Sequence, residues 1–403
     1  MATNTLLTIS DVTRELLMLF VGNLQAVKSV NKDYDNSFGK VGRKIGETLA
    51  VRLPNRFAVG SGAAVTATDY TETTVPVVLN QQKNIALEFT SKDLTLSLDD
   101  FSQRFLRPMA SKLAATVEAD LLTVLKNNSF QQVGTPGTAI TDLSVFFDAM
   151  AALQNFLVPY DDIKTLIAPT AYSKAAKLML NMFTPVTNEK IHAGSLGHAV
   201  NSDWYISQYL ASHTVGAHTG TKLVNGATQT GSTIALDGFA NSVTGALKQG
   251  DIITLAGVNF AHPMTGADTG NLASFVVTAD ANSNGTGQVN AVIYPAIITS
   301  GPYKTVTASP ADNAVVTVAG GAGSTYNVNM MIHRDAAVFV SAPLDVPGAV
   351  PGNVWQETDP ESGVSVTVEQ FRDGRSGSTL FRADVLYGVS PLRRECGVRI
   401  VTA

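Results

Sequence analysis

A long amphipathic segment between residues 97 and 128 constrains the fold of this chain more than any other stretch. Large apolar residues recur there at every fourth position, a spacing that places them along one side of an α-helix. The row comprises Phe101, Phe105, Met109, Leu113, Val117, Leu121 and Leu125. At 1.5 Å per residue such a helix is roughly 40 Å long, so we expect it to form the spine of a domain. Pro108 should kink the helix or mark a restart, and Ser97 or Asp99 should cap its first turn.

Three kinds of segment precede this helix. Residues 10–28 carry an apolar stripe at spacings of three and four, which predicts a helix with Ser10 as its N-cap. Residues 73–96 alternate like two strands, and the "LNQQKN" between them lacks the Asn-Gly pair that is typical of a tight hairpin. An extended ribbon, "KIGETLAVRLPNRFAVGSG", lies between these two regions. Its basic residues, with those just before it, are Lys40, Arg43, Lys44, Arg52 and Arg56, and Glu47 alone opposes them.

The chain after the long helix changes character twice. Residues 141–183 read as helix, strand and helix, which predicts a compact α/β unit. Residues 226–330 hold only seven charged residues and consist of short strand-like runs separated by turn residues. The runs are "STIALDG", "DIITLAGV", "SFVVTAD", "VNAVIYP", "YKTVTA" and "AVVTVAG". We expect a small barrel or sandwich inserted into the α/β unit.

The C-terminal region begins with a proline-rich segment. "SAPLDVPGAVPGNVWQETDP" carries four prolines, which predicts a loop rather than a regular element. The strand-like runs "SVTVEQF" and "TLFRADVLYGV" follow it.

The composition points to a subunit of an assembly. The 403 residues are enough for two or three domains with a large core. Charged residues make up 15% of the chain and hydrophobic ones 45%, whereas a typical globular protein has about 25% charged residues. A surface with so few charges is expected to be buried in part against other subunits. The formal net charge of −5 argues against a nucleic-acid binder in which the whole chain takes part.

The sequence also predicts a cellular compartment. Cys396 is the single cysteine, so no disulfide forms within the chain, which fits a reducing cytoplasm. The first residues lack the basic segment and cleavage site of a secretion signal, and the longest apolar run near them, residues 16–21, is too short to span a bilayer. We therefore expect a soluble, cytosolic product.

Two patterns resemble metal sites only superficially. "DANSNGTGQVNA" begins like a calcium-binding EF-hand loop, but Ala291 stands where the bidentate glutamate is needed. We interpret it as a polar hairpin loop. His213 and His218 are five residues apart and have no third ligand nearby in the sequence, so we expect local hydrogen bonds from them rather than zinc binding. No metal or cofactor site is predicted.

Catalytic motifs are missing from the sequence. It has no G-x-S-x-G nucleophile elbow and no phosphate-binding loop. The carboxylate pairs Asp99–Asp100 and Asp161–Asp162 stand at expected caps or turns, where capping explains them without a general acid. Residues 40–56 and 371–399 have a basic excess, which fits solvated faces, ion pairs to a neighbouring subunit or loose contact with nucleic acid. We predict a protein that is not an enzyme.

The order of these segments resembles the major capsid proteins of tailed bacteriophages, which share the Johnson fold. Within that family the chain is similar to coat proteins of short-tailed enteric phages that carry an inserted β-barrel. The segments that carry the resemblance are "YDNSFGKVGRKIGETLAVRLPNRF", "TTVPVVLNQQKNIALEFTSKDLTLSLDDFSQRFLRPMASKLA", "IHAGSLGHAVNSDWYISQYLASHTVGAHTGT", "GDIITLAGV" and "FRADVLYGV". Their order and spacing cover nearly the whole chain.

The resemblance implies an α+β fold with a fixed succession of parts. Each part takes one range of the chain: an N-terminal arm and helix (1–40), an extended loop with flanking strands (41–96), the spine helix of the peripheral domain (97–130), the α/β axial domain (131–225), the inserted β domain (226–330), and a return through the axial domain to C-terminal peripheral strands (331–403). The extended loop reaches over a neighbouring subunit in that family. This explains a ribbon without a core of its own, because such a segment becomes ordered only when a partner buries it.

The resemblance also implies a function and partners. The chain would assemble through hexamers and pentamers into the icosahedral shell around double-stranded phage DNA, inside the host bacterium. Its partners would be other copies of itself, a scaffolding protein, a portal and, weakly, the packaged DNA, with no membrane and no small-molecule substrate. Lys44, Arg52, Arg56 and Glu72 would be candidate contacts between subunits.

Two other readings stay open at this point. A tail-fibre or adhesin-like protein would account for residues 226–330, but not for the long helix or the α/β unit. A hydrolase would account for the α/β unit, but no nucleophile with a suitably placed base is evident.

Overall fold

The computed structural model describes residues 9–32, 46, 48–57, 74–89, 102–180, 198–346, 353–360, 362–372 and 379–402. By its internal contacts the chain divides into two compact units. Unit 1 comprises residues 1–52, 74–121 and 337–390, and unit 2 comprises residues 53–73, 122–336 and 391–403.

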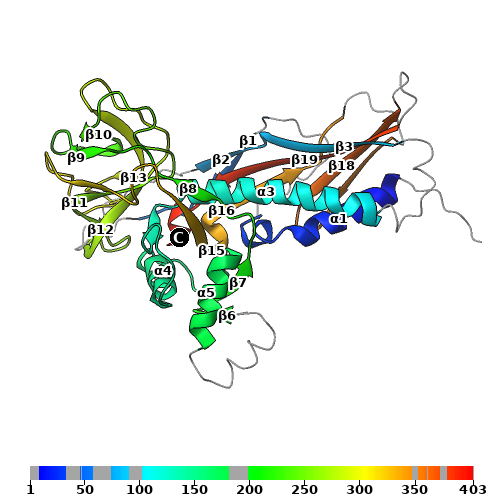
Figure 1. Cartoon of the computed structure of the whole chain (residues 1–403), viewed down its shortest axis with the longest axis horizontal. Helices are drawn as coiled ribbons and strands as arrows, with labels where there is room; N and C mark the ends of the chain where they lie inside the picture. Colours follow the sequence, from blue (N-terminus) through cyan, green and yellow to red (C-terminus); the bar gives the residue numbers. More distant parts are fainter. Residues whose placement is uncertain are drawn as a thin grey trace, which may run out of the picture. The chain divides into compact units, whose positions relative to one another are not determined.

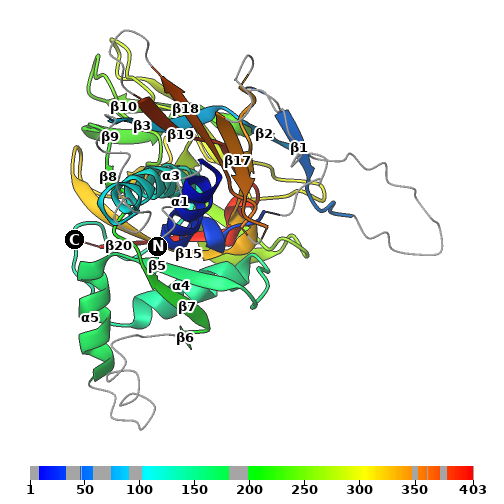
Figure 2. The same cartoon turned by 90° about the vertical axis from the view of Figure 1, so that its right-hand side faces the viewer.

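Unit 1 combines two helical segments with an antiparallel sheet (Figures 1 and 2). Its helical elements are α1 (Ile9–Asn23), the 3-10 turn η1 (Val27–Ser29), the π-helical turn η4 (Ser102–Leu106) and most of α3 (Arg107–Asn128). Its strands are β1 (Thr48–Arg52), β2 (Thr74–Val78), β3 (Gln81–Phe89), β16 (Ala337–Ala342), β17 (Val354–Thr358), β18 (Ser365–Arg372) and β19 (Thr379–Pro391). The strand order is β16-β19-β18-β17, with β3 also paired to β19, and β1 and β2 form a separate ladder.

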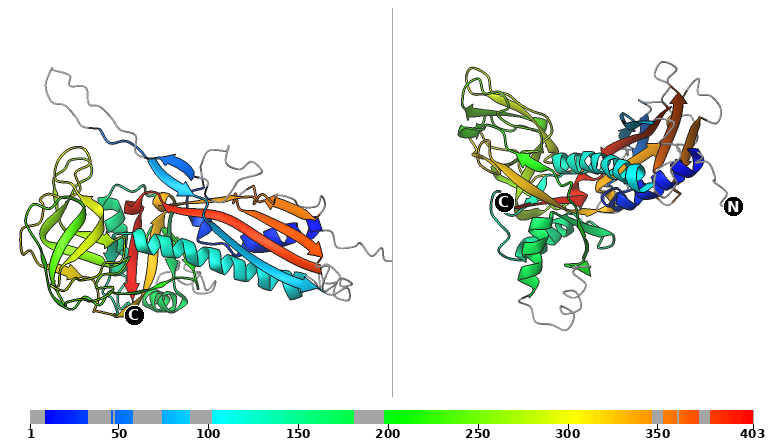
Figure 3. Two further views of the ribbon diagram at one scale, coloured as in Figure 1. Left: turned by 90° about the horizontal axis from the view of Figure 1, so that it is seen from above. Right: turned by 45° about the vertical axis from the view of Figure 1, so that its right-hand side comes forward.

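The spine helix restarts where the sequence predicts it. The π-helical turn ends at Leu106, and α3 begins at Arg107 with Pro108 as its second residue, where the missing proline N–H leaves no helical bond unmade. The predicted apolar row is buried from Met109 to Leu125. The left panel of Figure 3 shows β3 and β19 running along this helix. The predicted caps, Ser97 and Asp99, lie outside the described residues.

The N-terminal helix is shorter than predicted. It begins at Ile9, so Ser10 lies inside the first turn and is not the N-cap. It ends at Asn23. Just after it, the buried carboxylate of Glu118 on α3 accepts the N–H groups of Gln25 and Ala26, so these amides bond outside the helix. A second interpretation also needs correction: Val354–Thr358 is a strand, because it lies between the third and fourth prolines of its segment and pairs along its full length with β18.

Unit 2 contains a seven-stranded sheet flanked by helices. Its strand order is β4-β20-β15-β5-β7-β6, and β8 also pairs with β15. The strands are β4 (Gln131–Val133), β5 (Ile163–Ile167), β6 (His198–Ala199), β7 (Ser202–Ile206), β8 (Ser212–Thr214), β15 (Thr325–His333) and β20 (Gly397–Thr402). The helical elements are α4 (Ser144–Asn155), α5 (Pro169–Leu180) and the 3-10 turns η5 (Arg334–Ala336) and η6 (Arg394–Cys396). The predicted helix–strand–helix of residues 141–183 is confirmed as α4, β5 and α5.

A second sheet of unit 2 closes almost completely into a barrel. Its strand order is β14-β11-β12-β13-β10-β9, and a bridge between Leu223 and Val315 joins the two ends of that order. The strands are β9 (Gly220–Val224), β10 (Gly231–Phe239), β11 (Ile252–Ala261), β12 (Asp268–Val277), β13 (Val289–Ile297) and β14 (Val316–Val318). Figure 3 shows these strands wrapping around a common interior.

Glycine permits the closest backbone approach within this barrel. Gly238 has a φ of 75°, and a Cβ added there would lie 1.9 Å from the carbonyl oxygen of Thr221 on the neighbouring strand. No side chain fits at that distance, so this join between β9 and β10 requires glycine.

The strands of the barrel differ from the sequence interpretation at one position. "YKTVTA" contributes only an isolated bridge, between Phe260 and Val306, and the sixth strand is β9 instead. β9 lies before residue 226, and β15, which begins at Thr325, belongs to the other sheet.

Candidate functional site: subunit contacts and the barrel anchor

Two of the four candidate contact residues, Arg52 and Arg56, lie within the described part of the chain. Lys44 and Glu72 lie outside the described residues. Arg52 is the last residue of β1, stands opposite Thr74 of β2 and has an exposed side chain. Arg56 is half-buried in unit 2, and its backbone N–H donates to the Tyr303 hydroxyl at 3.4 Å. The structure therefore places Arg56 against the barrel of its own chain.

A cleft of about 450 Å³ surrounds the Arg56 side chain. Residues 53–56 form one side, and Leu157, Tyr294 and Tyr303 contribute to the others. The Arg394 guanidinium lies 4.3 Å above the centre of the Tyr294 ring, and burial raises the pKa of that phenol to about 12. These groups form a recess that is largely apolar, and cations lie at its edge.

A buried polar cluster anchors the barrel to the seven-stranded sheet. We define it as His213 on β8, Asp251 directly before β11, Tyr326 on β15 and Arg399 on β20. His213 Nε2 donates to Asp251 Oδ1 at 2.8 Å. Arg399 donates to the carbonyl oxygen of Gly250 at 2.5 Å and to the Tyr326 hydroxyl at 3.2 Å. These bonds connect the residues directly before a barrel strand to three strands of the other sheet.

The cluster concentrates charge where water is excluded. Arg399 and Asp251 are both fully buried, and the second oxygen of Asp251 accepts the backbone N–H groups of Gly216 and Lys248. Burial lowers the pKa of Arg399, while the nearby Tyr326 and Asp251 oppose that shift. A buried cation of this kind is tolerated only with such partners.

His213 makes the stability of the subunit depend on pH. Burial lowers the pKa of its imidazole below 6.5, Arg399 and Lys126 add to that effect, and Asp251 opposes it. Burial also lowers the pKa of His218 and of His333. Below pH 6.5 the unfolded chain therefore binds more protons than the folded one, so the free energy of unfolding falls as the pH decreases.

We expect the midpoint of urea unfolding to be lower near pH 5.5 than near pH 7.5. The variant H213Q, which keeps a donor for Asp251, should reduce this difference, whereas H198Q, at an exposed imidazole, should preserve it. Equal midpoints at both values, or an unchanged difference in H213Q, would contradict the assignment.

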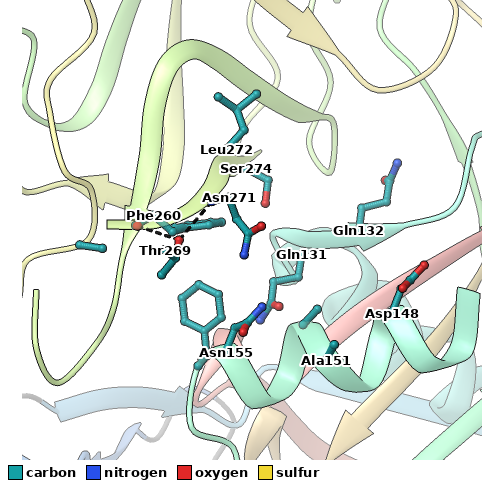
Figure 4. Close-up of a pocket in the computed structure, with 13 residues that line it drawn as sticks. Gln131, Gln132, Asp148, Ala151, Asn155, Phe260, Thr269, Asn271, Leu272 and Ser274 are labelled. Atoms are coloured by element: carbon teal, nitrogen blue, oxygen red, sulfur yellow. Dashed lines mark hydrogen bonds between the residues drawn. The ribbon is translucent and has the colours of Figure 1, made fainter. Parts of the chain in front are cut away.

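A second cavity bears on whether the protein is an enzyme. It has a volume of about 260 Å³ and lies between α4, β4 and the barrel strands β11 and β12 (Figure 4). Amide side chains line it, and Asp148 is the one titratable group among its lining residues. Thr269 Oγ1 donates to the carbonyl oxygen of Phe260 at 2.9 Å, so this hydroxyl is engaged within the barrel. Of the described residues that line the cavity, Thr269 and Ser274 carry hydroxyls, and neither hydroxyl forms a hydrogen bond with Asp148.

The two patterns that resemble metal sites are engaged in hydrogen bonds. Asn284 Oδ1 accepts the N–H groups of Thr286 and Gln288, and Asn282 Oδ1 accepts that of Gly245. His218 Nε2 donates to the carbonyl oxygen of Gly320 at 3.2 Å. The predicted local bonding is confirmed for Asn284 of the polar loop. It is wrong for His213, which bonds to Asp251, and His218 likewise bonds to Gly320, in a distant segment of the chain. Across the described ranges, no three His, Cys, Asp or Glu side chains converge as metal ligands.

No helix within the described part of the chain is both long and apolar enough to cross a membrane.

Comparison with known proteins decides the family. A family model described as "P22 coat protein - gene protein 5" matches residues 1–401. The chain belongs to this family. It is therefore the major capsid protein of a tailed phage, it forms the icosahedral shell, and its location is the virion. The predicted Johnson-type α+β fold with an inserted barrel is confirmed, and so is the absence of enzymatic function, because the family is one of structural coat proteins.

Solved structures show weaker similarity. A chain from Mycobacterium phage Che8 is 14% identical with a TM-score of 0.46, and the match covers 92% of this chain and 89% of that one. A chain from the capsid of cyanophage P-SCSP1u is 11% identical with a TM-score of 0.43, over 93% and 89%. The CUS-3 coat protein I-domain is 26% identical with a TM-score of 0.18, over 25% of this chain and 96% of that domain. No curated protein matches the chain.

Sequence reasoning missed the residues that hold the subunit together. Asp251, Tyr326 and Arg399 come from three distant segments, and no local pattern relates them. The one available signal was Asp251 itself, since a carboxylate directly before the apolar run "IITLAGV" needs a partner if that run is buried.

Proposed function

We propose that this coat subunit builds its shell through hexamers and pentamers around double-stranded DNA. A scaffolding protein and a portal would be its further partners during assembly in the host cytoplasm. Contact with the packaged DNA would be weak and non-specific, because the chain has a formal net charge of −5 and phosphate binding needs a cationic surface. Family membership supports this proposal.

We further propose a division of labour along the chain. Residues 1–40 would act as the arm, 41–96 as the extended loop, 97–130 as the spine, 131–225 as the axial domain and 331–403 as the return. The inserted domain, predicted as 226–330, would extend from β9 to β14, because these strands share one sheet.

The two-stranded ladder of β1 and β2 carries the contact proposal. Its five residue pairs run from Thr48–Val78 to Arg52–Thr74, and the segment that connects the strands leaves the ladder at Arg52. Leu49 and Val51 of the ladder pack on a core that includes Val338 and Val340, whereas the side chain of Arg52 is exposed. We propose that Arg52, together with Lys44, Arg56 and Glu72, contacts an adjacent subunit, and that Arg52 pairs with a carboxylate there.

Reversal of charge at Arg52 tests this contact. R52E should reduce the yield of shells about tenfold, because a pair of like charges replaces an attractive one at every copy of the interface. The yield is measured by sedimentation of assembly reactions at fixed subunit concentration. K112E, at an exposed lysine of α3 in the same unit, is the matched control and should assemble normally.

A compensating reversal should then identify the partner. An acidic residue changed to arginine in the neighbouring copy should restore assembly with R52E, and Glu72 is the first candidate. If R52E assembles normally but its shells package less DNA, Arg52 contacts nucleic acid instead. Normal assembly with normal packaging would remove Arg52 from both roles.

A further inference from the structure

Large apolar side chains are exposed around the Arg56 cleft. The exposed fractions are 79% for Met264 and 70% for Phe57. Leu157 and Tyr303, exposed by 46% and 39%, lie on the same rim. Side chains of this size are usually buried, and a group of them around a recess is typical of a surface that another protein covers.

The recess continues past the Arg56 side chain. A second cleft of about 770 Å³ shares residues 55–56 and 263–264 with the first and extends to Phe57, Gly301 and Lys304. Every residue that lines the two clefts belongs to unit 2, and most come from the barrel. The clefts thus form one groove, with Met264 between its two halves.

The charges in the groove favour an acidic, apolar partner. Arg56, Lys304 and Arg393 lie in it, and Glu395 is the only acidic residue among those that line it. Glu395 accepts a hydrogen bond from Arg393 at 3.2 Å, which leaves a net positive charge on the groove. The chain itself is acidic, with 33 Asp and Glu against 28 Lys and Arg, so a second copy has the complementary charge.

We propose that this groove, with Phe57, Leu157, Met264 and Tyr303 as its apolar rim, binds a second copy of the chain in the shell. The proposal rests on self-assembly, which the coat protein family establishes, and it assigns one surface to that assembly. A nucleic acid fits less well. Binding of single-stranded nucleic acid relies on aromatic side chains that stack with bases, whereas this rim is aliphatic as well as aromatic.

Hydrogen exchange of the wild-type protein provides the first test. Amides of residues 262–266 and 301–305 should exchange at least about tenfold more slowly in assembled shells than in free subunits, because a docked copy would exclude water from both loops. Equal exchange in the two states overturns the proposal.

Substitution of the central rim residue provides the second test. M264D should lower the yield of shells about tenfold, since it places a charge in an apolar contact opposite an acidic copy. V315D changes an exposed valine of the same barrel that lines neither cleft, and it should assemble normally. Thermal unfolding of both free subunits establishes that they fold, and F57S replaces M264D if that variant does not.

The outcomes of these tests distinguish a contact at this groove from a general defect in shell assembly. Lower yield in M264D but not in V315D supports the proposal. Normal yield in M264D overturns it, even if the R52E result stands. Shells of M264D that form normally but contain less DNA would assign the groove to nucleic acid and also overturn it.

Discussion

Replacement of Asp251 by alanine should lower the free energy of unfolding by about 3–5 kcal/mol, the usual cost of breaking a buried charge pair. Asp251 is fully buried, accepts hydrogen bonds from His213, Gly216 and Lys248, and attracts the buried Arg399. Its loss leaves donors without an acceptor and a cation without a counter-charge. Urea unfolding of the free subunit at pH 7.5 measures the effect.

Two companion variants make this prediction specific. D280A removes another carboxylate near the same turn, where exposed Asp280 accepts the Gln249 N–H, and should cost under about 1 kcal/mol. The double variant D251A/R399M should lose less free energy of unfolding than the sum of the losses in D251A and R399M. Each single variant leaves the other charge buried without its partner. Additive losses, or a loss below about 1 kcal/mol in D251A, would show that the pair does not stabilise the anchor.

Replacement of Glu118 by alanine should release the N-terminal helix from the spine helix. The side chain is 2% exposed, and its carboxylate accepts the N–H groups of Gln25 and Ala26, the latter at 2.6 Å. Loss of the acceptor leaves the buried N–H of Ala26 and the partly buried N–H of Gln25 without a partner, which costs about 1–3 kcal/mol. Burial raises the pKa of Glu118, and the bonds from these amides oppose that shift.

Because the bonds of Glu118 lie within one unit, hydrogen exchange can show where their loss acts. Amides of α1 should exchange much faster in E118A, while those of the barrel, in the other unit, should be unchanged. E118Q keeps an oxygen acceptor at the same place and should retain most of the protection. Similar exchange of α1 in wild type and E118A would contradict this role.

The sequence predicts the parts of this fold that depend on local patterning. The four-residue apolar row identifies the spine helix, and Pro108 marks its restart, because helical periodicity and the missing proline N–H act within a few residues. The strands β9 and β17 each pair with the next strand along the chain, β10 and β18, but neither has the apolar alternation by which strands are predicted from the sequence. Turn residues mark the ends of the extended run "YKTVTA" but do not determine which strand it pairs with, and it makes only an isolated bridge.

The contact residues are harder to predict for a related reason. A basic residue in a ribbon looks the same in the sequence whether it meets a neighbour, a solvated face or its own barrel. Arg52 and Arg56 are four residues apart, yet Arg52 is an exposed residue at the end of β1, whereas Arg56 lines a cleft of its own subunit. The apolar rim was missed because Phe57, Leu157, Met264 and Tyr303 come from four segments that only the fold brings together.

The pairing of β8 with β15 bears on how such a chain could gain or lose its barrel during evolution. Thr214 and Thr325 stand opposite each other, with their hydroxyl oxygens 2.9 Å apart, so the chain leaves the host sheet and returns to it at one place. A short turn between these residues would keep the strand order of that sheet. A descendant without the barrel would still inherit Arg399 and His213, whose partners at Gly250 and Asp251 would be gone. Apolar residues at those two positions are therefore the expected genetic trace of a barrel that was lost, and their polar counterparts mark a lineage that has kept it.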